Sequence, residues 1–191
     1  MSAVVEERAP ASVSKRLDPV VSRQALAGLP QPPRRGPGTV DAVDLSTLEP
    51  VLTITPEVRD AIVAHAKRDH PDEACGIVAG AEGSDRAERV VEMVNAAGSP
   101  TFYEFDSGEL LSLYKEMWAK DEEPVVIYHS HTATEAYPSR TDIGLASEPG
   151  AHYVLVSTRE HGNSEGPVEF RSYRIIDGEV TEEEVTLTEE S

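Results

Sequence analysis

Two histidines separated by one residue, His129 and His131, stand at the end of a short apolar segment. If that segment is a β-strand, alternate side chains share one face, so the two imidazoles can converge on one point. Asp142 follows eleven residues after His131, beyond a stretch long enough to loop back over the strand end. Two histidines and a carboxylate offer three ligands to a metal ion and leave a fourth position for water, which is the arrangement of a catalytic zinc site.

Glu73 and Ser139 could complete such a site. Glu73 enters an apolar segment, where a carboxylate is costly unless it is paired or has a chemical role. Beside a metal ion and its water, it could act as general base and then as general acid. Ser139 lies three residues before Asp142, so its hydroxyl could cap a helix or donate to a developing oxyanion. Each of these pieces alone also has a purely structural explanation, since His-x-His and Ser-x-x-Asp occur at ordinary strand ends and helix starts.

The remaining reactive side chains suit structural roles. The single cysteine, Cys75, excludes a disulfide framework and a multi-thiolate metal site, and we expect it to be a small core residue. We expect His65 and His152 to pack at the edge of the core. His70 and His161 are expected in solvated turns. The aromatic residues expected in the core are Tyr103, Tyr114 and Trp118.

Local signals place these residues on alternating helices and strands. Thr55-Pro56-Glu57 is typical of a helix start, and His70-Pro71 predicts the end of that helix. Further helices are expected to open at Asp106 and at Ser139, each of which has an acidic residue three positions later. Strands are predicted over 73–80, 89–95, 124–131, 151–157, 168–176 and 179–187, the last at an edge of the sheet. This order predicts a single domain of the α/β or α+β class.

The composition argues against several classes of partner. The 191 residues carry 17 Lys and Arg against 35 Asp and Glu, a net charge of −18. Nucleic acids and anionic membranes both attract clustered Lys and Arg, so no nucleic acid and no membrane is expected as a partner. No apolar run approaches the length of a spanning helix, and the N-terminus lacks the apolar segment of a secretory signal. We therefore expect a cytoplasmic location.

Charge and proline content divide the chain into three parts. Residues 1–40 contain six basic residues, three acidic residues and six of the 14 prolines, which leaves residues 41–191 with a net charge of −21. A segment of this kind buries too little apolar surface to offset its ordering entropy, so we predict a disordered extension over 1–45. The catalytic domain is predicted over 46–180, and an acidic C-terminal strand and tail over 181–191.

Taken together, these residues resemble the JAMM/MPN-plus (Mov34/MPN/PAD-1) family of zinc metallopeptidases. The family pattern is an upstream Glu, then His-x-His, seven residues, Ser, two residues and Asp. Here those positions are occupied by Glu73, His129, His131, Ser139 and Asp142. The resemblance implies the MPN (cytidine-deaminase-like) fold, in which helices flank a central mixed β-sheet. It also implies that the two histidines and Asp142 bind one catalytic Zn²⁺, that Glu73 is the acid–base, and that Ser139 stabilises the tetrahedral intermediate.

One position departs from this pattern, because Thr132 follows the second histidine where many members have proline. The segment 129–142 is nevertheless especially similar to an actinobacterial subgroup of the family. Those enzymes release cysteine from the C-terminus of a small ubiquitin-like sulfur-carrier protein (CysO-like) in cysteine biosynthesis. The resemblance, which covers about residues 51–178, therefore implies such a carrier as the substrate.

Three alternatives stay open at this stage. An isopeptidase would remove a ubiquitin-like modifier from protein lysines with the same catalytic groups. A non-catalytic MPN module would keep the fold and only bind partners. Two histidines and a carboxylate also form the facial triad of non-haem iron enzymes. The oligomeric state is open as well and includes a homodimer.

Overall fold

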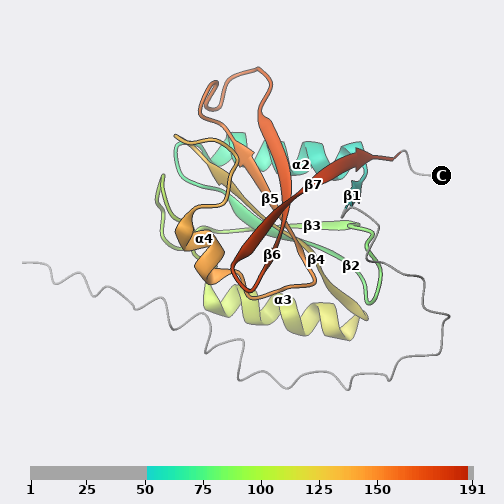
Figure 1. The fold of residues 1–191 in the computed structure, drawn as a ribbon. Helices are drawn as coiled ribbons and strands as arrows, with labels where there is room; N and C mark the ends of the chain where they lie inside the picture. The colour runs from blue at the N-terminus through green and yellow to red at the C-terminus, as the bar shows by residue number, and fades with distance from the viewer. Residues whose placement is uncertain (1–50, 189–191) are drawn as a thin grey trace, which may run out of the picture. The chain divides into compact units, whose positions relative to one another are not determined.

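The computed structural model describes residues 51–188. The predicted extension over 1–45 lies outside the described residues, and the boundaries 46–180 and 181–191 stay predictions. Within the described part, no helix is long and apolar enough to span a membrane. In chain order the elements are β1 (Val51–Ile54), α2 (Pro56–Asp69), β2 (Cys75–Ala81), β3 (Arg89–Met93), α3 (Ser107–Ala119), β4 (Glu122–His131), α4 (Arg140–Leu145), β5 (His152–Ser157), β6 (Glu169–Ile176) and β7 (Glu179–Leu187) (Figure 1).

The strands of the described chain form one mixed sheet in the order β1-β7-β6-β5-β4-β2-β3. β4 is parallel to β5 and β1 is parallel to β7, whereas the other neighbours are antiparallel. The prediction of a central mixed sheet is confirmed. The predicted edge position of the last strand is wrong, because β7 pairs with β6 over its first half and with β1 over its second. The short strand β1 gave no local signal, since its partner lies at the far end of the chain.

Helix α2 packs on one face of the sheet. Thr55 caps it by accepting a hydrogen bond from the Val58 N–H at 3.3 Å, and Pro56 is its first residue. The buried side chains of α2 pack against apolar residues of β1, β2, β4 and β5. His65 of this helix lies 2.7 Å from the Tyr128 hydroxyl, so Tyr128 of β4 faces α2.

Helix α3 lies on the opposite side of the sheet, where it contacts β4 (Figure 1). Asp106 caps it by accepting hydrogen bonds from the Gly108 and Glu109 N–H groups, each at 2.9 Å. Leu113, Tyr114 and Met117 are its buried residues. Burying apolar side chains of this size stabilises a fold by roughly 1.5–3 kcal/mol each, so both faces of the sheet contribute to the core.

The central strand β4 carries side chains to both faces. Because Tyr128 points toward α2, the alternation of a strand places His129 and His131 together on the α3 side. Gly76 pairs with Tyr128 across β2 and β4, and a Cβ at Gly76 would overlap the tyrosine ring. Glycine at position 76 therefore permits the ring of Tyr128 to cross β2, and the end of β4 is fixed in the sheet.

Candidate metal centre

The side chains of His129, His131 and Asp142 meet at one point. Nε2 of His129 lies 3.2 Å from Nε2 of His131, and each of these atoms lies 3.4 Å from Oδ2 of Asp142. None of the three side chains is more than 12% exposed. Within residues 51–188, no other group of three His, Cys, Asp or Glu side chains meets in this way. The structure thus brings together the three ligands that the sequence predicted.

The triangle of ligand atoms has the dimensions of a metal site. In a tetrahedral zinc centre with bonds of 2.0–2.2 Å, neighbouring ligand atoms lie about 3.3–3.6 Å apart. The observed separations of 3.2 and 3.4 Å agree with that spacing. Two imidazole nitrogens and one carboxylate oxygen are also typical ligands of catalytic zinc, which leave a position for water or substrate. The residues present therefore fit a divalent metal ion such as zinc.

Electrostatics within this cluster favour a cation. Burial lowers the pKa of His129, so this ring is neutral near pH 7. Burial also acts to lower the pKa of His131, but hydrogen bonds with Asp142 and the Glu135 carbonyl outweigh it, and the pKa is raised. Burial acts to raise the pKa of Asp142, but hydrogen bonds with both histidines hold it far below its usual range. The carboxylate is therefore ionised, and a metal ion that binds here displaces a proton.

His131 is oriented by hydrogen bonds from its other ring nitrogen. Nδ1 lies 2.9 Å from the Glu135 carbonyl oxygen and 3.0 Å from the Thr134 hydroxyl. Because a carbonyl only accepts, Nδ1 carries the proton of the neutral ring, and Nε2 keeps its lone pair for a metal ion. The loop after β4 thereby selects the ring tautomer that can act as a ligand.

The departure from the family pattern at Thr132 has a structural consequence. The Thr132 hydroxyl donates a hydrogen bond to the Pro100 carbonyl at 2.8 Å. Proline at this position has no hydroxyl and could not form this bond. Thr132 therefore links the loop that follows β4 to the loop 95–105, which lies beside it.

Asp142 reaches the site from the first turn of α4. Ser139 and Asp142 form a reciprocal capping box, in which the Ser139 hydroxyl accepts from the Asp142 N–H at 3.2 Å. In return, the Ser139 N–H donates to Oδ2 of Asp142 at 2.7 Å. This is the oxygen that faces both histidines, so the helix cap itself aims the carboxylate. The hydroxyl proton of Ser139 is not needed for the cap, and its role toward an oxyanion stays a prediction.

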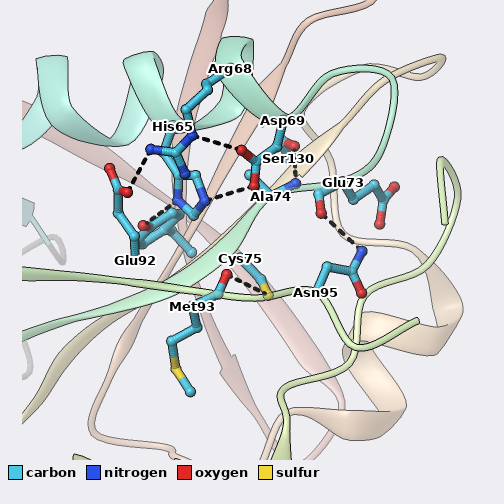
Figure 2. A network of polar contacts seen from close by, with 11 residues as sticks. His65, Arg68, Asp69, Glu73, Ala74, Cys75, Glu92, Met93, Asn95 and Ser130 are labelled. Carbon is cyan, nitrogen blue, oxygen red and sulfur yellow. Dashed lines mark hydrogen bonds and ion pairs between the residues drawn. The ribbon is translucent and has the colours of Figure 1, made fainter. Parts of the chain in front are cut away.

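Glu73 lies two residues before β2 and is 5% exposed. Its N–H donates to the Ser99 carbonyl and its carbonyl accepts from Nδ2 of Asn95, both at 2.9 Å. The carboxylate points away from these contacts (Figure 2). Burial raises the pKa of Glu73 to about 7, with the charge of His131 acting against this and that of Asp142 adding to it. A carboxyl group with such a pKa can both accept and release a proton near neutral pH.

Ser130, between the two histidines, links the segment that carries Glu73 to the end of β4. Its hydroxyl accepts from the Ala74 N–H at 2.8 Å, and its own N–H donates to the Ala74 carbonyl at 2.9 Å (Figure 2). The segment that carries Glu73 is therefore fixed to the end of β4. Sequence reasoning treated Ser130 as the variable residue of His-x-His, because its partner is distant along the chain.

Two further residues of the site had not been assigned there. Tyr103, expected in the core, stacks on His129 with ring centroids 4.5 Å apart and an interplanar angle of 24°. Asn95 holds the adjacent loop: its Nδ2 donates to the Phe102 carbonyl, and its Oδ1 accepts from the Ala97 and Glu104 N–H groups. No local pattern marks these contacts, because they arise only when the loop folds back on β4.

The remaining predictions are met in part. Cys75 is buried and burial raises the pKa of its thiol to about 12, which suits a core residue rather than a nucleophile. His65 and His152 are buried and hydrogen-bonded, to Asp69 and Glu183 respectively among others. The prediction that His70 and His161 lie in turns is confirmed, but the prediction that they are solvated is wrong. Both are half-buried, and His70 lies 3.1 Å from the Thr158 hydroxyl.

A cavity of about 380 Å³ adjoins the site but is separate from the metal centre. It lies between α2 and β3, and its lining includes His65, Arg68, Glu92, Glu73 and Asn95. None of the three candidate ligands lines it. Figure 2 shows Arg68 bridging Glu92 and Asp69 there, at 2.7 and 2.9 Å. Glu73 thus lines this cavity, whereas the candidate ligands do not.

The site therefore has the arrangement that the sequence predicted for a metallopeptidase: a His-x-His pair at the end of a central strand, an aspartate from the following helix cap, and a buried glutamate. The chain belongs to the family described as prokaryotic homologues of the JAB domain, whose model matches residues 55–176. The resemblance to the JAMM/MPN-plus family and the expected MPN fold are thereby confirmed.

Individual relatives agree with this family. The chain is 63% identical over 140 residues to the CysO-cysteine peptidase of Mycobacterium tuberculosis, covering 73% of this chain and 93% of that protein. It is 32% identical over 111 residues to a desampylase of Haloferax volcanii, covering 56% and 80% of the two chains. Among solved structures, a Desulfitobacterium hafniense protein is similar with a TM-score of 0.62 and 33% identity, over 73% of this chain and 94% of that one.

Proposed function

We propose that this chain is a zinc-dependent peptidase that releases cysteine, or another C-terminal amino acid, from a CysO-like sulfur-carrier protein. The observation that carries the proposal is the triangle of His129, His131 and Asp142 in a fold that also buries Glu73 close by. The substrate is taken from the 63% identity to the mycobacterial CysO-cysteine peptidase, of which the chain covers 93%. High identity over nearly the full length of that relative supports the same reaction in both proteins.

The two histidines and Asp142 would hold the zinc ion. When bound, zinc supplies a Lewis acid that polarises the scissile carbonyl and lowers the pKa of a water to roughly 7. Glu73 takes a proton from the attacking water while the water oxygen bonds to the carbonyl carbon of the carrier's last residue. The C–N bond then breaks, and Glu73 passes the proton to the leaving amine. Burial of Glu73, which raises its pKa to about 7 in the metal-free chain, favours uptake of the proton that the group must then release.

Ser139 is proposed to donate its hydroxyl proton to the oxyanion of the tetrahedral intermediate. The capping box does not use that proton, because the hydroxyl oxygen only accepts in it, from the Asp142 N–H. A donor that strengthens its contact as charge develops lowers the barrier selectively. The same residue would therefore both aim a ligand and stabilise the intermediate.

The second candidate is the removal of a ubiquitin-like modifier from protein lysines. The ligand set and Glu73 would serve either leaving amine equally well. The identity to the desampylase, 32% over 80% of that protein, is about half the identity to the CysO-cysteine peptidase. Release of a C-terminal cysteine is therefore the preferred reaction.

The decisive experiment is to incubate the full chain with carrier–cysteine and carrier–lysine adducts and to record the products by mass spectrometry. We expect cleavage of the cysteine adduct, and we expect a zinc chelator to abolish it. Glu73→Gln is the matched control, because it should retain zinc and lose roughly 10²–10⁴-fold in rate. Cleavage of the lysine adduct alone, or cleavage that survives chelation, would contradict the proposal.

The homodimer and the cytoplasmic location stay predictions. The described residues support only the coarser statement that none of their helices could span a membrane. Sedimentation of the full chain would establish the oligomeric state, independently of the catalytic test.

A further inference from the structure

The two histidines of the metal centre are held in different ways. Hydrogen bonds from Nδ1 to the Glu135 carbonyl and the Thr134 hydroxyl fix the ring of His131. His129 has no such bond, because its Nδ1 is not hydrogen-bonded to any residue of the described part of the chain. A metal ligand normally needs a group behind it that fixes its ring plane. For His129, that group is found on the face of the ring rather than at its nitrogen.

Tyr103 lies on that face. Its ring is nearly parallel to the imidazole, with 4.5 Å between centroids and 24° between planes. Phe105 packs edge-on against Tyr103, with ring centroids 5.4 Å apart. The Tyr103 hydroxyl forms no hydrogen bond with residues 51–188, so the stacked ring is the contact that this side chain makes with the site. Stacked aromatic pairs of this geometry are stabilising beyond the area that they bury.

The loop that carries Tyr103 is itself rigidly held. Asn95 hydrogen-bonds four backbone groups, those of Glu73, Ala97, Phe102 and Glu104, and the last two flank Tyr103. A bridge between Asn95 and Phe105 closes the loop, and the Thr132 hydroxyl ties it at Pro100 to the chain just after His131. A side chain in a loop that is fixed at both ends can restrict the movement of the side chain that packs against it.

We propose that Tyr103 is a positioning residue for the metal centre. Its ring restricts the rotation of His129 so that Nε2 stays directed at the point it shares with His131 and Asp142. The inference rests on the metal centre of the proposed function, but it does not depend on the substrate. It assigns to the ring, not to the hydroxyl, the role that a hydrogen bond plays for His131.

The test is the zinc affinity of variants of the full chain, measured by competition with a chromophoric chelator. Tyr103→Phe keeps the ring and should bind zinc within about threefold of the wild type. Tyr103→Leu and Tyr103→Met remove the ring and should weaken binding roughly 10–100-fold, the range found when the group behind a metal ligand is lost. Tyr137→Leu is the matched control: Tyr137 is 46% exposed, and its ring packs edge-on against Tyr173 rather than against a histidine of the metal centre, so the zinc affinity of this variant should be unchanged.

The absorption of the cobalt-substituted protein supplies a readout that a general loss of stability would not move. Tyr103→Phe should keep the visible bands of the wild type, whereas a folded non-aromatic variant should shift or weaken them as the geometry at His129 loosens. Wild-type affinity in both non-aromatic variants would overturn the proposal, as would equal weakening by Tyr103→Phe. Those results would leave cleavage of the carrier adduct intact, whereas a failed cleavage assay would leave the affinity series standing. The two proposals can therefore fail separately.

Discussion

Two buried clusters of histidine and carboxylate occur in this molecule, and they are completed differently. In the first, His129, His131 and Asp142 converge on one point. In the second, His152 Nδ1 lies 2.7 Å from Oε2 of Glu183 on β7, and Arg174 approaches both residues at 2.8 Å. Because a guanidinium only donates, His152 accepts through Nε2 and donates through Nδ1. The second cluster is therefore satisfied by groups of the chain itself.

The difference between the clusters is the source of the cation. Burial acts to raise the pKa of Glu183, but the hydrogen bond and charge of His152, the Ser172 hydroxyl and the charge of Arg174 together hold it down. Within residues 51–188, no Lys or Arg forms an ion pair with Asp142. A buried carboxylate with two histidines and no Lys or Arg beside it is a site at which a metal ion from solution can replace a proton. Burial alone would not have distinguished the two clusters.

The largest effect is expected when a candidate ligand is removed from the first cluster, because only this cluster is expected to bind a metal ion. His129→Ala should abolish zinc binding and, with it, peptidase activity. Zinc should then no longer raise the unfolding temperature, whereas it should stabilise the wild type by about 2.7 kcal/mol at a hundred times its Kd. Metal analysis and thermal unfolding with and without zinc measure this. His161→Ala, in a turn outside the cluster, is the control, and a zinc-replete His129→Ala protein would refute the ligand assignment.

Removing the carboxylate of the second cluster should lower the stability of the fold and leave zinc binding unchanged. Glu183→Gln leaves His152 and Arg174 without their anion and should lower the free energy of unfolding by about 3–5 kcal/mol, the usual result of breaking a buried ion pair. Zinc affinity of the folded variant should be unchanged. Chemical denaturation in the presence of a chelator gives the first quantity and zinc competition the second. Lost zinc affinity at unchanged stability would show that the two clusters are not independent.

The same comparison explains what could be predicted from the sequence. The candidate ligands and Ser139 could be predicted from the sequence because their spacing is local. His-x-His needs only the alternation of a strand, and Ser-x-x-Asp needs only the first turn of a helix. The helix starts at Thr55 and Asp106 were predicted for the same reason. Tyr103 and the His152–Glu183 pair were not assigned, because their contacts join segments that meet only in the folded sheet. The parallel pairing of β1 with β7 is a further long-range contact without a local signal.

Glu73 is a third buried carboxylate, and within the described residues it has no cation in direct contact. Its pKa is raised from 4.5 to about 7, so its contribution to stability is fully present below about pH 4.5 and is lost as the pH rises through 7. At about 1.4 kcal/mol for each pKa unit, the metal-free wild type should lose about 3 kcal/mol over this range. Glu73→Gln should lack that slope. Urea denaturation with chelator at pH 5 and pH 8 measures it, and parallel pH profiles for the two proteins would contradict the raised pKa.

The smallest expected effect on stability concerns Ser139, at the rim of the first cluster. Ser139→Ala removes the cap acceptor of α4 and should cost about 1 kcal/mol, whereas Ser139→Gly should cost only a few tenths. Both variants keep the backbone N–H that holds Oδ2 of Asp142, so zinc affinity should be retained. If the hydroxyl donates to the oxyanion, both should lose about 10²–10³-fold in rate, irrespective of stability. If the rate instead follows the stability of α4, with glycine close to the wild type, the hydroxyl acts only as a helix cap, and the cluster then needs a different donor for the oxyanion.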